Sequence, residues 1–263
     1  MAFTRRQRRR EALARPFPDT WRDLLAQNVA HWGVLDAIER TRLEELIRII
    51  LVDKDWEAAN GFALTDEIRL IISAMACLLI LGLDYDYYHG VTSIIVTPTT
   101  MVREGDRHVG GGLYTDEPER LIGLAQYNGP VVIAWDAAAA QARDPHGGHN
   151  VVYHEFAHKL DMLDGTVDGT PPLGSPEQYR RWAEVGRAEY SLLRAGRGGD
   201  LLDPYGGVDS GEFFAVVTEV FFDVPIDMER EKPRLYAMLR DFYQQDPAAR
   251  ERRAPTPPSL KPR

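Results

Sequence analysis

The chain has 263 residues, 44% of them hydrophobic, which is enough to build one packed core. Its net charge is −9, and residues 1–15 hold six arginines and one glutamate, so the rest carries 25 basic and 39 acidic residues. Such an acidic body argues against nucleic acid binding. Cys77 is the single cysteine, which excludes an intrachain disulfide and fits a reducing compartment, so we expect a cytoplasmic protein.

The two ends differ in composition from the rest of the chain. No apolar stretch follows the arginine-rich residues 1–15, so we expect a flexible basic tail rather than a secretory signal. The alternative for this tail is weak contact with a membrane surface or nucleic acid. Residues 16–247 are expected to form a single domain. Residues 248–263, rich in proline and basic residues, are expected to be disordered.

Two helices are predicted in the first third of the chain. Apolar residues recur with helical spacing from Leu35 to Val52. A second helix is predicted over residues 64–83, with Thr65 or Asp66 at its start. Its apolar run, residues 70–83, is too short to cross a bilayer, so we expect a buried helix and no membrane partner.

The middle of the chain predicts a small sheet. Residues 93–97 read as a strand, and Asn128-Gly129 joins two apolar runs, 121–127 and 131–135, as in a hairpin. We expect Val131–Trp135 to offer an edge for pairing with an extended peptide. Residues 110–112 are three glycines, but no Gly-Lys-Ser/Thr follows, so we interpret them as a flexible loop rather than a nucleotide site.

The most informative segment is the predicted helix 151–163, which contains the pattern H-E-x-x-H. Residues four apart lie on one helix face, so His154 and His158 can bind one metal ion. Glu155 would stand beside the ion as general base for a zinc-bound water. Gly165 is expected to cap the helix. The alternative is a pair of histidines with ordinary hydrogen bonds on a surface helix.

Zinc in a hydrolase needs a third protein ligand, and two places could supply it. Asp164 would require the helix to break soon after the motif. Glu212 lies in the apolar segment 209–223, where acids are costly to bury without a partner. Glu212 could instead cap its own helix with Asp209. Glu219 could steady a histidine N–H, or be the ligand itself with Asp223 behind it.

Three further positions could contribute. Tyr205 lies seven residues before Glu212 and could donate a hydrogen bond to an oxyanion, or be ordinary loop packing. Asp161 is a plausible acceptor for His154 or His158, or a solvated acid. The loop histidines at 146 and 149 are expected to be solvent-exposed rather than metal-bound.

Two more helices are predicted, near residues 176–194 and 230–244. With the helix that carries Glu212, the order becomes helices, a small sheet, then helices. This order indicates an α+β fold that is mainly helical. We detect no internal repeat.

Several motifs together resemble the Mlc titration factor A family of zinc metallopeptidases. They span roughly residues 20 to 250 and include Asn60-Gly61-Phe62, Leu81-Gly82-Leu83, Gly129-Pro130-Val131-Val132, residues 154–161, Glu212-Phe213-Phe214-Ala215-Val216 with Glu219, and Phe242 to Pro247. The resemblance implies a gluzincin-type, zincin-like domain that contains an H-E-x-x-H active-site helix.

The resemblance also implies roles for individual residues. His154, His158 and Glu212 would bind Zn²⁺, and Glu155 would be the catalytic acid and base. Tyr205 would correspond to a catalytic tyrosine that the family has seven positions before its ligand glutamate. The implied activity is aminopeptidase-like hydrolysis of short peptides in the cytoplasm. The implied partner is a glucose-responsive transcriptional repressor of sugar uptake. The rival hypothesis is a binding protein that sequesters such a repressor and uses zinc only structurally.

Overall fold

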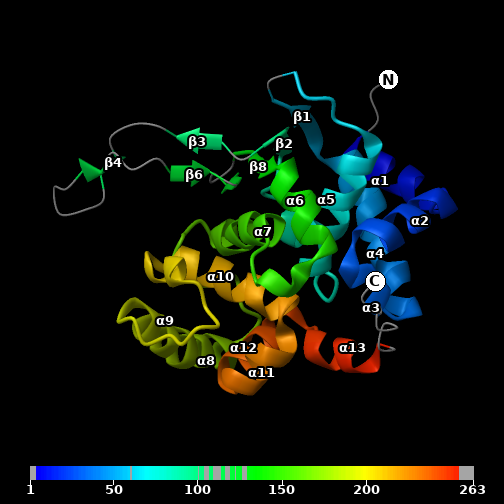
Figure 1. The fold of residues 1–263 in the computed structure, drawn as a ribbon. Coiled ribbons are helices and arrows are strands. Elements are labelled where there is room, and N and C mark those ends of the chain that lie inside the picture. Colours follow the sequence, from blue (N-terminus) through cyan, green and yellow to red (C-terminus); the bar gives the residue numbers. More distant parts are fainter. Residues whose placement is uncertain are drawn as a thin grey trace, which may run out of the picture.

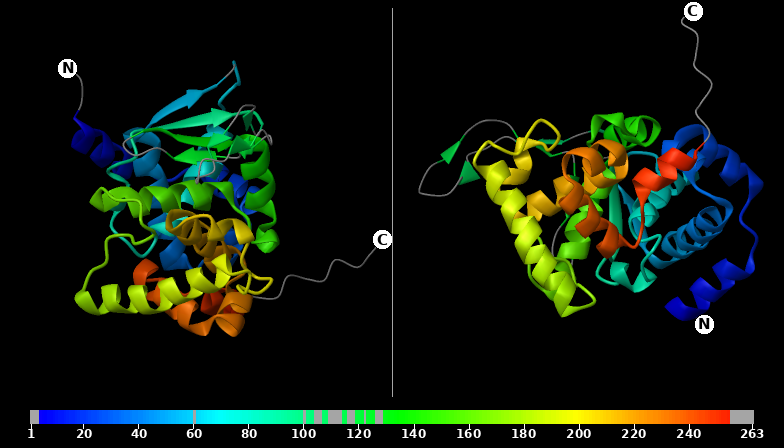
Figure 2. Two further views of the ribbon diagram at one scale, coloured as in Figure 1. Left: turned by 90° about the vertical axis from the view of Figure 1, so that its left-hand side faces the viewer. Right: turned by 90° about the horizontal axis from the view of Figure 1, so that it is seen from below.

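The computed structural model describes residues 4–59, 61–99 and 129–254, together with the backbone of short strands between residues 101 and 125. Helices lie below a small sheet and on one side of it (Figure 1). Seen from the side, the strands lie above α7 (Val151–Asp161), and the α8–α9 segment runs below it (Figure 2). Helix α7 therefore lies in the middle of the molecule. The fold is mainly helical, as predicted.

The N-terminal region is built from five helices: α1 (Arg5–Ala14), α2 (Asp19–Asn28), α3 (Ala30–Val34), α4 (Ala37–Asp53) and α5 (Asp66–Leu79). Helices α4 and α5 confirm the two predicted apolar helices. Asp36 caps α4 by accepting the amides of Ile38 and Glu39, and Thr65 caps α5. Cys77 is fully buried in α5.

Residues 5–14, which composition alone presented as a flexible tail, form helix α1. Thr4 and Gln7 make a capping box at its start. Arg9 then donates from Nε to Asp53 at 2.9 Å, so the helix is tied to the end of α4. Arginine-rich composition did not reveal this order because the partner carboxylate lies 44 residues away in the sequence.

The main sheet has four strands in the order β1 (Asp55–Ala58), β2 (Ser93–Thr97), β8 (Val131–Ala134) and β7 (Gly123–Ala125). The first three are parallel, and β7 runs antiparallel to β8, which confirms the predicted hairpin pairing. The expectation that Val131–Trp135 forms a free edge is wrong. Strand β8 pairs with β2 on one side and β7 on the other, and the chain enters α6 (Trp135–Arg143) at residue 135.

Two short antiparallel pairs extend from this sheet, β3 (Met101–Arg103) with β6 (Glu119–Leu121) and β4 (Arg107–His108) with β5 (Tyr114–Thr115). Figure 1 shows them projecting away from the helices. The glycines at 110–112 lie outside the described residues, so the loop prediction there stays a prediction.

Helices dominate the rest of the chain. After α7 and the 3₁₀ turn Met162–Asp164, the chain forms one continuous helical segment made of α8 (Pro176–Arg181), a π-helical turn (Trp182–Gly186) and α9 (Arg187–Arg194). Gly165 adopts φ 92° and ends the 3₁₀ turn, one turn later than α7 itself. Helix α10 (Ser210–Asp223) then packs against α7.

The C-terminal part contains α11 (Pro225–Glu231), α12 (Pro233–Tyr243) and α13 (Pro247–Arg253). Pro233 starts α12, so the predicted helix 230–244 is divided near Lys232. Residues 248–253, expected to be disordered, belong to α13, where Arg250 pairs with Glu39 of α4 at 2.8 Å. Residues 255–263 lie outside the described part. Among the described helices, none has the length and apolar character needed to cross a membrane.

Candidate metal centre

Helix α7, which carries the H-E-x-x-H residues, has one face buried in the core and one polar face. Asn150 caps the helix by accepting the amide of Tyr153 at 3.2 Å. Tyr153, Phe156 and Leu160 are fully buried in the core. Because hydrophobic burial fixes one face of the helix, both histidines are held on the other face, toward α10.

Helix α10 supplies the facing carboxylate. Its N-cap is Asp209, whose Oδ1 accepts the backbone amide of Glu212 at 2.9 Å. The Glu212 side chain is directed at the histidines: its Oε2 lies 3.0 Å from Nε2 of His154 and 3.5 Å from Nε2 of His158. Asp209 thus accepts a free amide at the start of α10, and the Glu212 carboxylate remains available to a metal ion.

Three electron-pair donors converge at this point. Nε2 of His154 and Nε2 of His158 are 3.2 Å apart, and Glu212 Oε2 completes the triangle. The side chains of His154, His158 and Glu212 are only 17%, 12% and 18% exposed. In a tetrahedral site with bonds of about 2.0–2.1 Å, neighbouring ligand atoms are about 3.3 Å apart. The observed separations fit this spacing, so the three residues could hold a metal ion.

The histidine tautomer points to the same conclusion. Nδ1 of His154 lies 2.7 Å from Oε1 of Glu219. A carboxylate accepts hydrogen bonds, so in the neutral ring Nδ1 carries the proton and Nε2 presents a lone pair to Glu212. While His154 is neutral, no hydrogen-bond donor in the described part of the chain satisfies Glu212 Oε2. A cation between these atoms would remove the conflict.

Electrostatics around His154 favour positive charge. Burial lowers the pKa of His154, but the carboxylates of Glu212 and Glu219, which lie 3.0 and 2.7 Å from its two ring nitrogens, raise it further, to about 10. For Glu212, burial raises the pKa, yet the two histidines bring it well below the usual range. The same two carboxylates that favour a proton on the ring would also favour a metal cation.

Glu219 is held by a second contact. Its Oε2 accepts the backbone N–H of Asn150 at 2.5 Å, and only a small fraction of the residue is exposed. The two oxygens of Glu219 therefore join the start of α7 to His154. Sequence reasoning did not name Asn150, although an asparagine directly before a helix is a recognisable cap.

Glu155 lies beside the triangle rather than in it. The residue is 4% exposed, and its Oε2 has no hydrogen-bond partner among the described residues. Burial raises the pKa of Glu155 to about 7, although His154 and His158 lower it in part. A carboxylate with a pKa near neutrality can both accept and release a proton under physiological conditions.

Tyr205 comes close to the same histidine from a different element. It lies in the 3₁₀ turn Pro204–Gly207, which Asp203 caps, and is 42% exposed. Its ring centroid is 6.2 Å from that of His154. The turn packs against α10, so the phenol is near the candidate metal centre although it is seven residues before Glu212.

Asp161 accepts no hydrogen bond from His154 or His158 within the described structure, so the expectation of such a bond is wrong. It is fully buried, and its Oδ2 accepts the backbone N–H of Gly169 at 3.0 Å. Burial raises the pKa of Asp161 to about 6. Gly169 has φ 74°, and a Cβ there would be 2.1 Å from the carbonyl oxygen of Ser210. Asp161 therefore anchors a tight loop against the start of α10.

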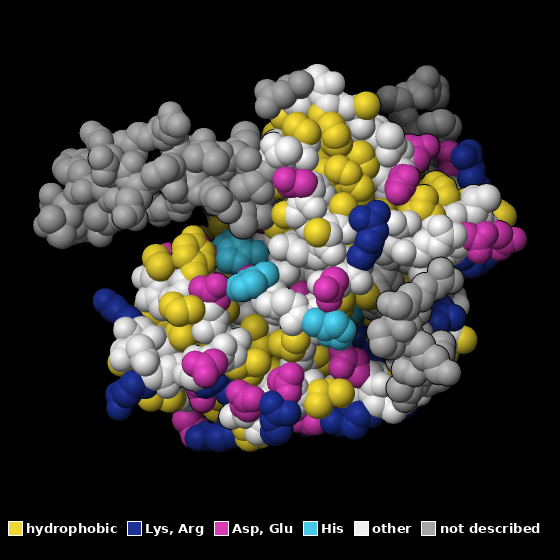
Figure 3. All heavy atoms as spheres, in the orientation of Figure 1, with side chains coloured by type: hydrophobic (Ala, Val, Ile, Leu, Met, Phe, Trp, Pro, Cys, Tyr) yellow, Lys and Arg dark blue, Asp and Glu magenta, His cyan; other side chains and the backbone are white. Residues whose placement is uncertain are grey.

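The remaining candidates lie elsewhere. Asp164 accepts the amide and hydroxyl of Thr166 and does not belong to the triangle. Asp223 lies 3.0 Å from Nε2 of His31, a partner that sequence reasoning missed because it is 192 residues away. Several histidine side chains are visible at the surface in the orientation of Figure 1, as Figure 3 shows. The exposure of a histidine therefore does not by itself identify a metal site.

The loop histidines are also outside the triangle. Nε2 of His149 is 3.6 Å from Asp203, and His146 lies in the 3₁₀ turn Pro145–Gly147. Neither belongs to the group of side chains that could hold an ion in the described part of the structure.

Comparison with known proteins adds independent information. The sequence model of the family described as glucose-regulated metallo-peptidase M90 matches residues 3–244. The chain belongs to this family. An uncharacterized protein of Synechocystis is 35% identical over 91% of this chain and 89% of its own length. Proteins named Mlc titration factor A are 29% identical in Serratia proteamaculans and 28% identical in Escherichia fergusonii, each over 89% of both chains.

Membership of the M90 family points to a metallopeptidase and so to a bound metal. It agrees with the family resemblance found in the sequence motifs. The matched residues include all of α7 and α10, which carry the three converging side chains.

Proposed function

We propose that this protein is a cytoplasmic, zinc-dependent peptidase of the gluzincin type that hydrolyses short peptides. The observation that carries the proposal is the triangle of His154 Nε2, His158 Nε2 and Glu212 Oε2, with sides of 3.0 to 3.5 Å. Two imidazoles and one carboxylate are a ligand set that zinc hydrolases use. With neutral imidazoles and no ion, the lone pairs of these buried atoms would face one another.

The neighbouring residues have chemically distinct roles in this proposal. Zinc, when bound, supplies a Lewis acid that lowers the pKa of water and polarises a carbonyl. Glu155, whose pKa is about 7, accepts the proton of the attacking water and delivers it to the leaving amine. Tyr205 donates its phenol O–H to the developing oxyanion. Glu219 holds His154 in the tautomer that turns Nε2 toward the ion.

The aminopeptidase preference rests on the family resemblance of the motifs. It is tested by cleavage of a peptide panel in which each sequence carries either a free or a blocked N-terminus, together with zinc analysis of the same protein. An aminopeptidase should cleave the free form much faster. Equal cleavage of both forms would still indicate a peptidase but would refute the assignment as an aminopeptidase.

The ligand assignment is tested by paired variants. Glu212→Ala should lose bound zinc because it removes one of three protein ligands. Asp164→Ala should keep zinc, because Asp164 holds Thr166 and not the triangle. Metal analysis of the purified proteins measures both. Zinc retained in Glu212→Ala and lost in Asp164→Ala would overturn the assignment.

A second candidate function is binding of a transcriptional repressor. It is supported by the name Mlc titration factor A that relatives carry. A pull-down with intact protein and with Glu155→Gln separates the two functions, because pure binding should not depend on the general base. Equal capture by both proteins, with hydrolysis lost only in the variant, would indicate that both functions reside in one chain.

A further inference from the structure

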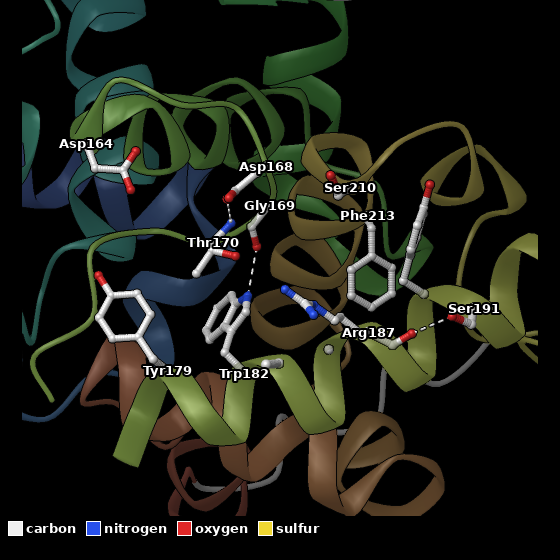
Figure 4. A pocket seen from close by; sticks show the side chains of 13 residues that line it. Asp164, Asp168, Gly169, Thr170, Tyr179, Trp182, Arg187, Ser191, Ser210 and Phe213 are labelled. Atoms are coloured by element: carbon white, nitrogen blue, oxygen red, sulfur yellow. Dashed lines mark hydrogen bonds between the residues drawn. The ribbon is translucent and has the colours of Figure 1, made fainter. Parts of the chain in front are cut away.

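A cavity of about 680 Å³ opens on the side of α10 next to the candidate metal centre. Ser210 and Phe213, on either side of Glu212 in the sequence, line it from α10, and the loop after α7 closes its top (Figure 4). The opposite wall is the α8–α9 segment. None of the three converging side chains belongs to its lining. The cavity has the size of a small-ligand site.

Aromatic rings form much of the wall. The indole Nε1 of Trp182 donates to the carbonyl of Gly169 at 2.8 Å, which fixes the ring against the loop. Tyr190 and Phe213 meet edge to face, with ring centroids 5.7 Å apart. Tyr179 lies at one end (Figure 4). Such a lining favours a ligand with a large apolar side chain.

The wall also contains a π-helical turn. It runs from Trp182 to Gly186, and both of these residues line the cavity. Single π-turns inside helices are rare and occur often at functional sites. Here the turn is followed directly by Arg187, which is exposed toward the cavity.

Arg187 supplies an unpaired cation. Its guanidinium points into the cavity, between Trp182 and Phe213 (Figure 4). Within the described residues its side chain has no ion pair, whereas Arg180 and Arg181 on the same helical segment pair with Glu177 and Asp241.

The two acidic residues in the lining, Asp164 and Asp168, accept hydrogen bonds within their own turns. Asp168 accepts the amide of Thr170 at 3.0 Å, and Asp164 accepts from Thr166. The cavity therefore presents one cation among aromatic rings, and no carboxylate of the described residues is bound to it.

We propose that this cavity binds the carboxylate of a ligand that carries a large apolar side chain. Arg187 would hold the carboxylate through its planar fork of donors, and the rings of Trp182 and Phe213 would contact the side chain. Two sources share this chemistry: a free amino acid and the C-terminal residue of a short peptide. The site is separate from the metal triangle and goes beyond the proposed hydrolysis.

Calorimetry with four related probes tests the proposal and separates the sources. N-acetyl-L-phenylalanine and L-phenylalanine carry the carboxylate, whereas N-acetyl-L-phenylalaninamide and L-phenylalaninamide do not. We expect each acid to bind at least about tenfold more tightly than its amide, because the charge-assisted contact is lost in the amide. Preference for the N-acetylated acid would identify a peptide C-terminus as the source, and preference for L-phenylalanine a free amino acid. Equal binding of acids and amides, or no binding of either acid, would overturn the proposal.

Matched variants locate the binding. Arg187→Gln should reduce the affinity for the acids to that of the amides, whereas Arg194→Gln, two turns further along α9 and outside the lining, should not. Measurements are made on the full-length protein with and without a chelator, because a carboxylate could also bind a metal ion. Binding that survives the chelator and is lost in Arg187→Gln supports the cavity. Binding unchanged in Arg187→Gln refutes it and leaves the hydrolytic proposal untouched.

Discussion

Two regions of this protein bury several charged groups, and they do so in different ways. The first, called here the N-terminal charge cluster, consists of Arg9, Asp53, Lys54 and Tyr85. The second is the metal triangle of His154, His158 and Glu212, with Glu155 and Glu219 beside it. Both combine acids and bases within a few ångströms. Only one of them pairs each donor with an acceptor.

In the N-terminal charge cluster, the carboxylate of Asp53 is enclosed by donors. It receives Arg9 Nε at 2.9 Å, Lys54 Nζ at 2.9 Å and the Tyr85 hydroxyl at 3.1 Å. Lys54 also donates to the carbonyl of Tyr88 at 2.7 Å. Burial alone would raise the pKa of Asp53, but Arg9 and Lys54 lower it to about 2. The cluster is complete without any ligand.

In the metal triangle, acceptors face acceptors. Within the described residues, Glu212 Oε2, Glu155 Oε2 and His158 Nδ1 are buried without hydrogen bonds. Unsatisfied buried polar atoms are destabilising, by roughly 1–3 kcal/mol each, and are rare in native proteins. The contrast teaches that a buried charge cluster is structural when each carboxylate has its hydrogen-bond donors. A cluster in which lone pairs converge on one point is instead a site for a bound cation.

The largest effect is expected at the general base. Glu155→Gln should lower peptide hydrolysis about 10²- to 10⁴-fold, because the amide cannot accept the water proton, while zinc content stays unchanged. Steady-state cleavage and metal analysis measure the two quantities. The exposed Glu177→Gln serves as control. Full activity in Glu155→Gln would refute the assignment.

The next effect concerns the N-terminal charge cluster. Lys54→Met removes one cation from a buried group and leaves Asp53 only partly paired, so unfolding should become easier by about 3–5 kcal/mol. Thermal or urea unfolding measures this change, with the exposed Arg10→Met as control. Added zinc should not restore the loss. A change no larger than that of the control would show that the cluster is not needed for stability.

A smaller effect is expected at Glu219. Glu219→Gln replaces the carboxylate that holds Nδ1 of His154 and should weaken zinc binding roughly 10- to 100-fold. Competition with a chelator of known affinity measures the change. The exposed Glu231→Gln should bind zinc like the wild type. Unchanged affinity in Glu219→Gln would mean that His154 keeps its orientation without this contact.

The smallest effect is a dependence on acid pH. The pKa of Asp53 is about 2 in the folded state, below its ordinary value near 3.9. A lowered folded pKa stabilises the fold above the unfolded pKa, and this contribution is lost as pH falls from about 4 toward 2. The stability difference between wild type and Asp53→Asn should therefore shrink over that range. A constant difference would contradict the lowered pKa.

Much of the helical framework could be predicted because its signals are local. The apolar spacing gave α4 and α5, and the motif gave α7 with Glu155 beside two histidines. Strand β2 was predicted with its observed bounds. Errors occurred where a distant partner decides the outcome: Arg9 orders α1 through Asp53, and Arg250 orders α13 through Glu39.

The sequence by itself determined that two imidazoles share a helix face and that an acid lies in a later apolar helix, since both follow from helical periodicity. Only the tertiary structure decided which acid lies next to the imidazoles and that β8 is an interior strand. It also decided that Asp161 accepts a hydrogen bond from Gly169 and not from a histidine. The physical reason is that periodicity fixes the direction of a side chain along its own element. Which atoms it meets depends on how the core packs elements that are far apart in the sequence, such as those of His154 and Glu212, 58 residues apart, or of His31 and Asp223, 192 residues apart.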